Sequence, residues 1–258
     1  MAQSLKDRIV FITGASSGIG AACAFAFARA GARLLLVARR EDRLREVAGA
    51  ITRETGAVVH AATLDTTDRG GVSAFVAGLP PEWRAIDVLV NNAGKALGFS
   101  KLHEGNVDDW EEMIDTNVKG LLYVDRAVLP GMVERRSGHV IHIGSIAGHE
   151  VYPNGNVYCA TKFAVDAITK GTRMDVLGSG VRISSVDPGL VETEFSLVRF
   201  KGDAERAKVV YQGIQPLTPE DVAETVLFVA TRPPHVNVAQ LVVLAGNQAA
   251  AAMLHREK

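Results

Sequence analysis

Short apolar runs alternate along the chain with longer segments in which apolar side chains recur at helical spacing. The runs have the length of strands, and several are apolar at consecutive positions, as expected of parallel strands covered on both faces. The expected strands are 8–13, 33–38, 57–64, 86–90, 139–143, 181–186 and 240–244. The alternation predicts a single-domain, Rossmann-type, doubly wound parallel sheet of seven strands with helices on both faces.

The helical segments carry start and stop signals. Helices are expected over 21–30, 107–134 and 157–177, with Gly31 closing the first. Another begins at Thr218, where a threonine N-cap is followed by Pro219 and by the acid Asp221 at the third helical position.

Length and charge restrict the class of protein. The 258 residues contain no Pro/Ser-rich linker or repeat, so one catalytic domain over 1–258 is expected. With 28 basic and 29 acidic residues the charge is balanced, which predicts a small-molecule substrate and neither a nucleic-acid nor a membrane partner. The sequence lacks an apolar signal core and a run of about 18–20 apolar residues, which favours a cytoplasmic protein.

A glycine-rich turn follows the first strand and precedes the first helix. It reads Thr13-Gly14-Ala-Ser16-Ser17-Gly18-Ile19-Gly20. Gly14 permits the turn, Gly18 lets a pyrophosphate approach the backbone, and Gly20 lets the helix pack close to the strand. The order of strand, turn and helix indicates a dinucleotide site.

The ends of the second and third strands bear on the choice of dinucleotide. Arg39 and Arg40 stand where NAD-preferring sites carry an acid, so a 2′-phosphate and hence NADP(H) is expected. The alternative is that Arg39 and Arg40 form a basic surface patch exposed to solvent. Asp65 after the third strand either accepts from an adenine amino group or caps the next helix.

Tyr158 and Lys162 lie four residues apart in a helical segment, on one face. A lysine ammonium beside a phenol favours the phenolate, and a tyrosine pKa near 7 to 8 requires about 3 to 4 kcal/mol of differential stabilisation. Ser145, thirteen residues earlier and directly after a strand, either hydrogen-bonds the substrate oxygen or only caps a turn. The pair predicts proton transfer at the carboxyl edge of the sheet.

With these motifs together the chain resembles the short-chain dehydrogenase/reductase family over about residues 7–245. The resemblance rests on the glycine turn, Asn91-Asn92-Ala93-Gly94, Asp115-Thr-Asn117, Ser145, the Tyr158/Lys162 pair and Pro188-Gly189. It implies a catalytic tetrad of Asn117, Ser145, Tyr158 and Lys162, in which Asn117 holds a water that links Lys162 to solvent.

The expected cofactor-binding residues come from the glycine turn, the strand ends and the tyrosine helix. They are Gly14, Ser16, Ser17, Gly18, Ile19, Gly20, Arg39, Arg40, Asp65, Asn91, Ala93, Gly94, Tyr158, Lys162, Pro188, Gly189, Val191 and Thr193.

Four segments, 94–98, 144–148, 188–203 and 217–224, are similar to the NADP-dependent 3-hydroxy acid dehydrogenases. This implies hydride transfer between NADP(H) and a small 3-hydroxy acid or its oxo form, of the serine, allo-threonine or 3-hydroxypropionate/malonic semialdehyde type, in a homotetramer. The alternatives are an NADPH-dependent reductase of other small carbonyls (sulfoacetaldehyde, diketones, ketoesters) and a non-catalytic NADPH-binding module. The last is disfavoured because each tetrad position keeps a reactive side chain.

The substrate is expected to be an anion bound beside a segment of about 190–215. Arg199 in that segment is the preferred ligand for its charge, and Lys95 and His149 are the other candidates. No metal site is expected: His139 and His142 are three residues apart on a strand, so they point to opposite faces.

Overall fold

The computed structural model describes residues 3–257 and has the expected architecture. Seven parallel strands form one sheet in the order β3-β2-β1-β4-β5-β6-β7. The strands are β1 Ile9–Thr13, β2 Arg33–Ala38, β3 Val59–Thr63, β4 Val88–Asn91, β5 Gly138–Ile143, β6 Val181–Pro188 and β7 Gln240–Val243. The strand order reverses between β1 and β4, and ligands of such sheets bind outside the carboxyl ends at this point.

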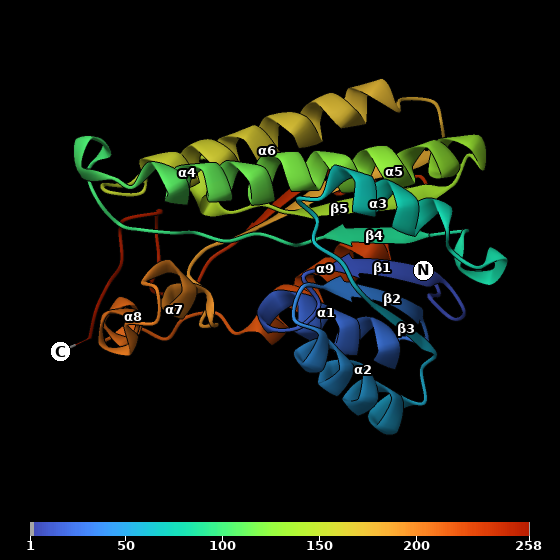
Figure 1. Cartoon of the computed structure of the whole chain (residues 1–258), viewed down its shortest axis with the longest axis horizontal. Coiled ribbons are helices and arrows are strands. Elements are labelled where there is room, and N and C mark those ends of the chain that lie inside the picture. Colours follow the sequence, from blue (N-terminus) through green and yellow to red (C-terminus); the bar gives the residue numbers. More distant parts are fainter. Residues whose placement is uncertain (1–2, 258) are drawn as a thin grey trace.

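Helices cover both faces of the sheet (Figure 1). One layer holds α1 (Gly18–Arg29), α2 (Glu41–Thr55) and α9 (Pro219–Ala230). The other holds α3 (Arg69–Ala77), α4 (Val107–Ile114), α5 (Leu121–Glu134) and α6 (Asn156–Asp175). The central strand β1 is buried at every position, because helices cover both of its faces.

Two apolar clusters hold the layers together. One lies between the sheet and α1, α2 and α9 and includes Phe27, Leu36 and Val226. The other lies on the opposite face, against α3 and α5, and includes Phe11 and Met132. The alternation of strand and helix thus produces two cores, one on each face of a single sheet.

Local signals set the helix ends. The expected capping box of α9 is confirmed: the Thr218 hydroxyl accepts from the Asp221 amide, and the Asp221 carboxylate accepts from the Thr218 amide. Gly31, at φ +86°, follows the C-cap residue Ala30 of α1. The long helix expected over 107–134 is instead α4 and α5 joined by a π-helical segment, Asp115–Gly120, which carries Asn117.

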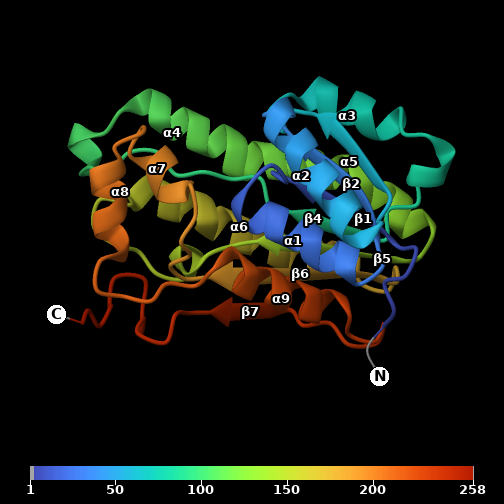
Figure 2. The ribbon, with the colours of Figure 1, turned by 90° about the horizontal axis from the view of Figure 1, so that it is seen from below.

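Two short helices, α7 (Phe195–Arg199) and α8 (Ala204–Tyr211), lie away from the sheet near its carboxyl edge (Figures 1 and 2). The C-terminal segment runs beside α8, and the N-terminus lies at the opposite end of the molecule (Figure 2). The space at the carboxyl edge therefore has the strand ends on one side and α7 and α8 on another.

None of the helices in residues 3–257 combines the length and the apolar character needed to cross a membrane.

Candidate active site

A cavity of about 980 Å³ opens at the carboxyl edge of the sheet. It extends from the glycine turn to α7, α8 and the C-terminal segment. The expected residues that line it are Gly14, Ser16, Ser17, Gly18, Ile19, Arg39, Arg40, Asp65, Ala93, Gly94, Lys95, Ser145, Tyr158, Lys162, Pro188, Gly189, Val191, Thr193 and Arg199. Its volume is at the upper end of the range for small-molecule sites, which suits a dinucleotide together with a small substrate.

The glycine turn has the geometry of a cofactor cradle. Gly14 and Gly18 have φ angles of +66° and +54°, and a Cβ on Gly14 would lie 2.9 Å from the Asn92 amide nitrogen. Gly20 does not line the cavity; a Cβ there would come within 2.4 Å of the Gly14 carbonyl oxygen. Gly20 therefore permits the close packing of α1 against the turn. The backbone of the turn that faces the cavity stays open, and its residues fit the diphosphate of a dinucleotide.

Arg39 and Arg40 line the cavity beside the glycine turn. The Arg40 guanidinium donates to the Ser17 hydroxyl at 2.6 Å and forms an ion pair with Glu194 at 2.9 Å. Arg43 lies 3.6 Å from the same carboxylate. Glu194, from the segment before α7, had not been singled out in the sequence; no spacing rule links it to an arginine 154 residues away.

Asp65 does not cap the following helix. Asp68 does so, accepting from the Gly71 amide, while the Asp65 carboxylate accepts from the amide and hydroxyl of Thr67. Partial burial acts to raise the pKa of Asp65, but the Thr67 hydrogen bonds and the charge of Arg39 prevail and lower it. Asp65 is therefore an ionised acceptor on the cavity wall.

Asn91 faces away from the cavity. Its side chain is buried, donating to Asp125 at 3.1 Å and accepting from the Thr13 hydroxyl at 3.2 Å. The expectation that Asn91 contacts the cofactor is thus not met by its position; its neighbours Asn92, Ala93 and Gly94 form the wall.

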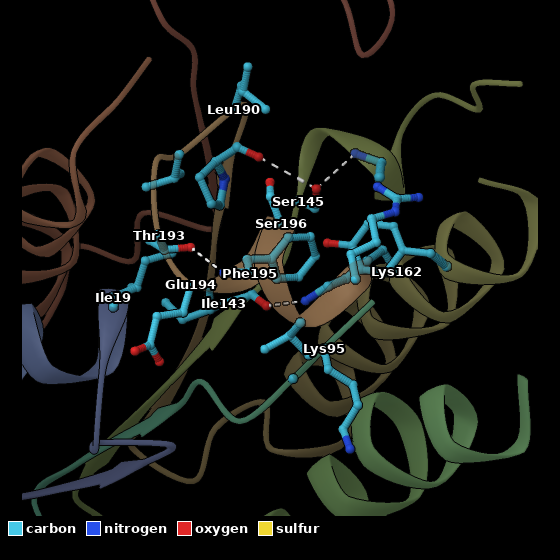
Figure 3. A pocket seen from close by; sticks show the side chains of 18 of the residues that line it. Ile19, Lys95, Ile143, Ser145, Lys162, Leu190, Thr193, Glu194, Phe195 and Ser196 are labelled. Atoms are coloured by element: carbon cyan, nitrogen blue, oxygen red, sulfur yellow. Dashed lines mark hydrogen bonds between the residues drawn. The ribbon is translucent and has the colours of Figure 1, made fainter. Parts of the chain in front are cut away.

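Tyr158 and Lys162 lie on α6, one turn apart, at the other end of the cavity. The Lys162 ammonium donates to the Ile143 carbonyl at 2.9 Å, as Figure 3 shows. Ser145 follows β5, accepts from the Ala147 amide at 3.1 Å and hydrogen-bonds Tyr158. Ser145 therefore caps a turn and also lies beside the tyrosine, and its hydrogen bond to a substrate oxygen stays a prediction.

The pKa of Tyr158 is shifted upward, opposite to the expected direction. Burial raises it well above the usual value, and proximity to Tyr152 adds to this, while the Ser145 hydrogen bond and the Arg199 charge act against it. Burial also lowers the pKa of Lys162 to about 8, against the effect of Asp187. The prediction of a tyrosine pKa near 7 to 8 is wrong for the protein alone, because desolvation outweighs the Ser145 hydrogen bond and the Arg199 charge.

Asn117 joins the tetrad through the backbone. Its amide oxygen accepts from the Lys95 amide at 2.8 Å, and its amide nitrogen donates to the Lys95 carbonyl at 2.8 Å and to the Thr161 hydroxyl at 3.0 Å. A Cβ on Gly94 would lie 3.3 Å from the Asn117 oxygen and 3.8 Å from Lys162 Nζ. Asn117 thus ties the loop after β4 to α6, and the water that it was expected to hold stays a prediction.

Arg199 is the cation next to the reactive tyrosine. Its guanidinium lies 5.6 Å from the centroid of the Tyr158 ring, 4.9 Å from that of Phe99 and 5.4 Å from that of Tyr152. Its Nε donates to the Gly98 carbonyl at 3.2 Å. Within residues 3–257 no carboxylate lies within 4.0 Å of Arg199, so its charge is available to a ligand.

The other two candidate anion ligands are engaged elsewhere. The Lys95 ammonium forms an ion pair with Glu112, and in Figure 3 it points away from Ser145 and Lys162. His149 lies off the cavity and contacts Asp187 at 2.7 Å. An acid thus occupies each group, and a role for either in binding the substrate anion stays a prediction.

Aromatic rings form the remaining wall near Tyr158. Phe195 packs edge-on against Tyr158 at 5.6 Å between centroids, and Tyr152 stacks on Phe99 at 6.4 Å. These rings were missed in the sequence. The available signal was their position directly after the strand-end motifs, Phe99 after Gly94 and Tyr152 after Ser145.

The described residues hold no cluster of three or more His, Cys, Asp or Glu side chains suited to a metal ion. His139 and His142 bond separately to Ser184 and Asp125.

Comparison with known proteins agrees with this geometry. The family model of the short chain dehydrogenases matches residues 8–203. The chain is 47% identical over 251 residues to the NADP-dependent 3-hydroxy acid dehydrogenase YdfG of Escherichia coli (strain K12), covering 96% of this chain and 100% of that protein. It is 45% identical over 242 residues to sulfoacetaldehyde reductase 2 of Chromohalobacter salexigens, covering 93% and 95% of the two proteins.

Among solved structures, the closed form of serine dehydrogenase complexed with NADP⁺ matches with a TM-score of 0.90 at 47% identity. The match covers 96% of this chain and 100% of the other. With the tyrosine, lysine, serine and asparagine assembled at the edge of the same sheet, this chain belongs to the short chain dehydrogenase family.

Proposed function

We propose that this protein is an NADP-dependent dehydrogenase that interconverts a small 3-hydroxy acid and its oxo form. The observation that carries the substrate class is Arg199, a cation without a carboxylate partner among residues 3–257, above the ring of Tyr158. An acid whose hydroxyl meets Tyr158 places its carboxylate within reach of that guanidinium. The 47% identical relative from E. coli, named a 3-hydroxy acid dehydrogenase, supports the same class.

Each side chain has a role in this reaction. When bound, NADP(H) supplies or accepts the hydride. Tyr158 exchanges the proton of the substrate hydroxyl, Ser145 donates a hydrogen bond to the reacting oxygen, and Lys162 stabilises the phenolate when it forms. Asn117 keeps the loop after β4 against α6, so that the cofactor and the tyrosine stay in register. The glycine turn and α6 would hold the cofactor between them, and Arg39 and Arg40 would meet its 2′-phosphate.

The unit that carries this function is one catalytic domain over 1–258, in which the segment of about 190–215 closes over the substrate. Support comes from α7 and α8, which provide Phe195 and Arg199 to the cavity wall. The assembly is expected to be a homotetramer. Apolar side chains exposed on α5 and α6, including Leu122, Phe163 and Met174, support self-association, and light scattering after gel filtration would measure it.

The substrate class is tested with a panel. NADP⁺ with serine, allo-threonine, 3-hydroxypropionate and isethionate is assayed beside NADPH with malonic semialdehyde, sulfoacetaldehyde and uncharged diketones. The proposal expects kcat/KM for the carboxylates to exceed that for the diketones. Preference for isethionate and sulfoacetaldehyde would favour the second candidate, a sulfoacetaldehyde reductase, which the 45% identical relative supports. Bound cofactor with no turnover on any compound would overturn both.

Cofactor selectivity follows from the two arginines. Arg39→Ala is expected to raise KM for NADP⁺ about 10- to 100-fold and KM for NAD⁺ less than about threefold, because charge-assisted hydrogen bonds to the 2′-phosphate are lost. Arg40→Ala should act in the same direction. Arg45→Ala is the control, since Arg45 pairs with Glu41 on the outer surface of α2. Equal losses with NADP⁺ and NAD⁺ would show that Arg39 does not read the phosphate.

The pH dependence follows from the raised pKa of Tyr158. A phenol with a raised pKa stays protonated throughout the neutral range, so the acid needed for reduction is present at both pH 6.5 and pH 8. The phenolate needed for oxidation increases with pH, until loss of the Lys162 charge near its pKa of about 8 weakens its stabilisation. Oxidation should therefore be slower at pH 6.5 than at pH 8, whereas the rate of reduction should change little over this range. An oxidation rate that does not change over this pH range would contradict the assignment.

A further inference from the structure

A chain of buried polar side chains lies behind the active site and takes no part in the reaction described above. Its centre is His142 on β5, which is 0% exposed, paired with Asp125 on α5, which is 3% exposed. The His142 Nε2 lies 2.9 Å from an Asp125 carboxylate oxygen, and its Nδ1 lies 2.8 Å from the Thr169 hydroxyl. Burying two ionisable groups in an apolar core is costly unless each is fully bonded.

The proton count along these bonds places a hydrogen on Nε2 of His142. The Asp125 carboxylate has no hydrogen to give, so Nε2 must carry the one in the bond between them. The Thr169 hydroxyl lies 2.7 Å from the Val165 carbonyl and 2.8 Å from Nδ1, so it can bond both groups. His142 and Asp125 thus form a fully bonded buried pair.

From Asp125 the chain continues to the cofactor end of the cavity. Its second oxygen accepts from the Asn91 amide at 3.1 Å, and the other amide hydrogen of Asn91 goes to a backbone carbonyl of α5 at 3.0 Å. The Asn91 oxygen accepts from the Thr13 hydroxyl. That hydroxyl accepts from the amides of Asn92 and Ala93, both at 2.9 Å. The chain therefore ends on the backbone that forms the cavity wall.

At its other end the chain reaches the tyrosine helix. Thr169 lies on α6, two turns beyond Lys162. His142 immediately precedes Ile143, whose carbonyl accepts from the Lys162 ammonium. His142 and Asp125 thus connect α6, which carries Tyr158 and Lys162, to the turn Asn92–Gly94 on the cavity wall.

We propose that His142 and Asp125 are positioning residues: their hydrogen bonds hold the turn Asn92–Gly94 and the end of β1 in place against α6 for cofactor binding. This rests on the proposed NADP(H) function. Neighbouring ionisable groups have partners of their own. Asp187 accepts from Gln240 and contacts His149, and Asp166 pairs with Lys170.

The hydrogen on Nε2 of His142 is detected by ¹⁵N NMR of the histidine side chains in wild-type protein at pH 7.5. Nε2 is expected to carry hydrogen in wild type. In Asp125→Asn the new amide donates to Nε2 and its oxygen still accepts from Asn91, so the hydrogen is expected on Nδ1 instead. A wild-type His142 without hydrogen on Nε2 would overturn the bond assignment. This measurement does not depend on turnover or on bound cofactor.

The positioning role of His142 and Asp125 is tested by measuring the Kd for NADPH and kcat separately. Asp125→Asn keeps the acceptor for Asn91, so the Kd for NADPH should stay within about twofold of wild type. Asp125→Ala removes the acceptor and should raise that Kd about tenfold, with kcat at saturating cofactor changed less than about threefold. Should Asp125→Ala fail to fold, Asp125→Ser, which is too short to reach Asn91, is measured in its place and has the same expected result.

His139→Asn is the matched control. His139 is on the same strand, is 2% exposed, and bonds only to Ser184 on the opposite side of β5. It should lower the melting temperature without changing the Kd for NADPH. A wild-type Kd in folded Asp125→Ala or Asp125→Ser, or an equal rise in His139→Asn, would overturn the positioning role. If wild type itself bound no NADPH, the proposed function would fail while the NMR result would stand.

Discussion

Tyr158→Phe is expected to abolish turnover, with kcat lower by about 10²- to 10⁴-fold in both directions, the contribution typical of a general acid or base. The substitution removes the hydroxyl but keeps the ring that packs against Phe195 and lies beneath Arg199. Stability and the cavity shape should therefore be preserved, and the Kd for NADPH should stay within about threefold. Steady-state kinetics and fluorescence titration with NADPH measure the two effects.

Tyr123→Phe controls for loss of a tyrosine hydroxyl away from the cavity. Tyr123 lies on α5 and packs against the second apolar cluster, so its variant should keep wild-type kcat. Near wild-type turnover in Tyr158→Phe would mean that another group transfers the proton.

Arg199→Met should lower kcat/KM for carboxylate or sulfonate substrates about 10- to 100-fold while leaving uncharged carbonyls nearly unaffected. Methionine keeps an apolar side chain against Phe99 and Tyr152 but has no charge for the anion. Because the Arg199 charge also lowers the pKa of Tyr158, the measured quantity is the ratio of kcat/KM for charged to uncharged substrates at one pH.

Arg206→Met tests whether the effect comes from a direct contact between Arg199 and the substrate anion or from positive charge in the cavity in general. Arg206 also lines the cavity, but its guanidinium lies over Phe200, on the side of α8. Its variant should change the ratio less than about threefold. A larger loss in Arg206→Met than in Arg199→Met, or equal losses on charged and uncharged substrates, would remove Arg199 as the anion ligand.

The fold could be predicted because its signals are local. Consecutive apolar positions marked β1 and β2, the Thr218/Asp221 box marked the start of α9, and alternation of the elements indicated the sheet. Local signals also placed Ser145 directly after a strand and Tyr158 and Lys162 on one helix. The apolar periodicity did not show the π-helical segment around Asn117, because the segment has only six residues and α-helix continues on both sides of it.

The features of the site that the sequence did not show depend on which groups meet across the fold. Lys95 and His149 both follow strands, but in the fold Glu112 pairs with Lys95 and Asp187 contacts His149. The pKa of Tyr158 depends on how far water is excluded around it, which the spacing to Lys162 does not describe. Arg199 could be preferred because its segment is similar to that of related enzymes, while its place above Tyr158 required the structure.

The two halves of the cavity wall come from separable parts of the chain. Proton transfer and cofactor contacts are built on the sheet edge and α6, whereas Arg199, Phe195 and Arg206 come from short helices that lie away from the sheet (Figures 1 and 2). Exchange of the α7–α8 segment alone would therefore present a different surface to the substrate while Tyr158, Lys162 and Ser145 keep their places. For an engineer this makes substrate preference a property that can be grafted, with the tyrosine helix and the glycine turn left untouched.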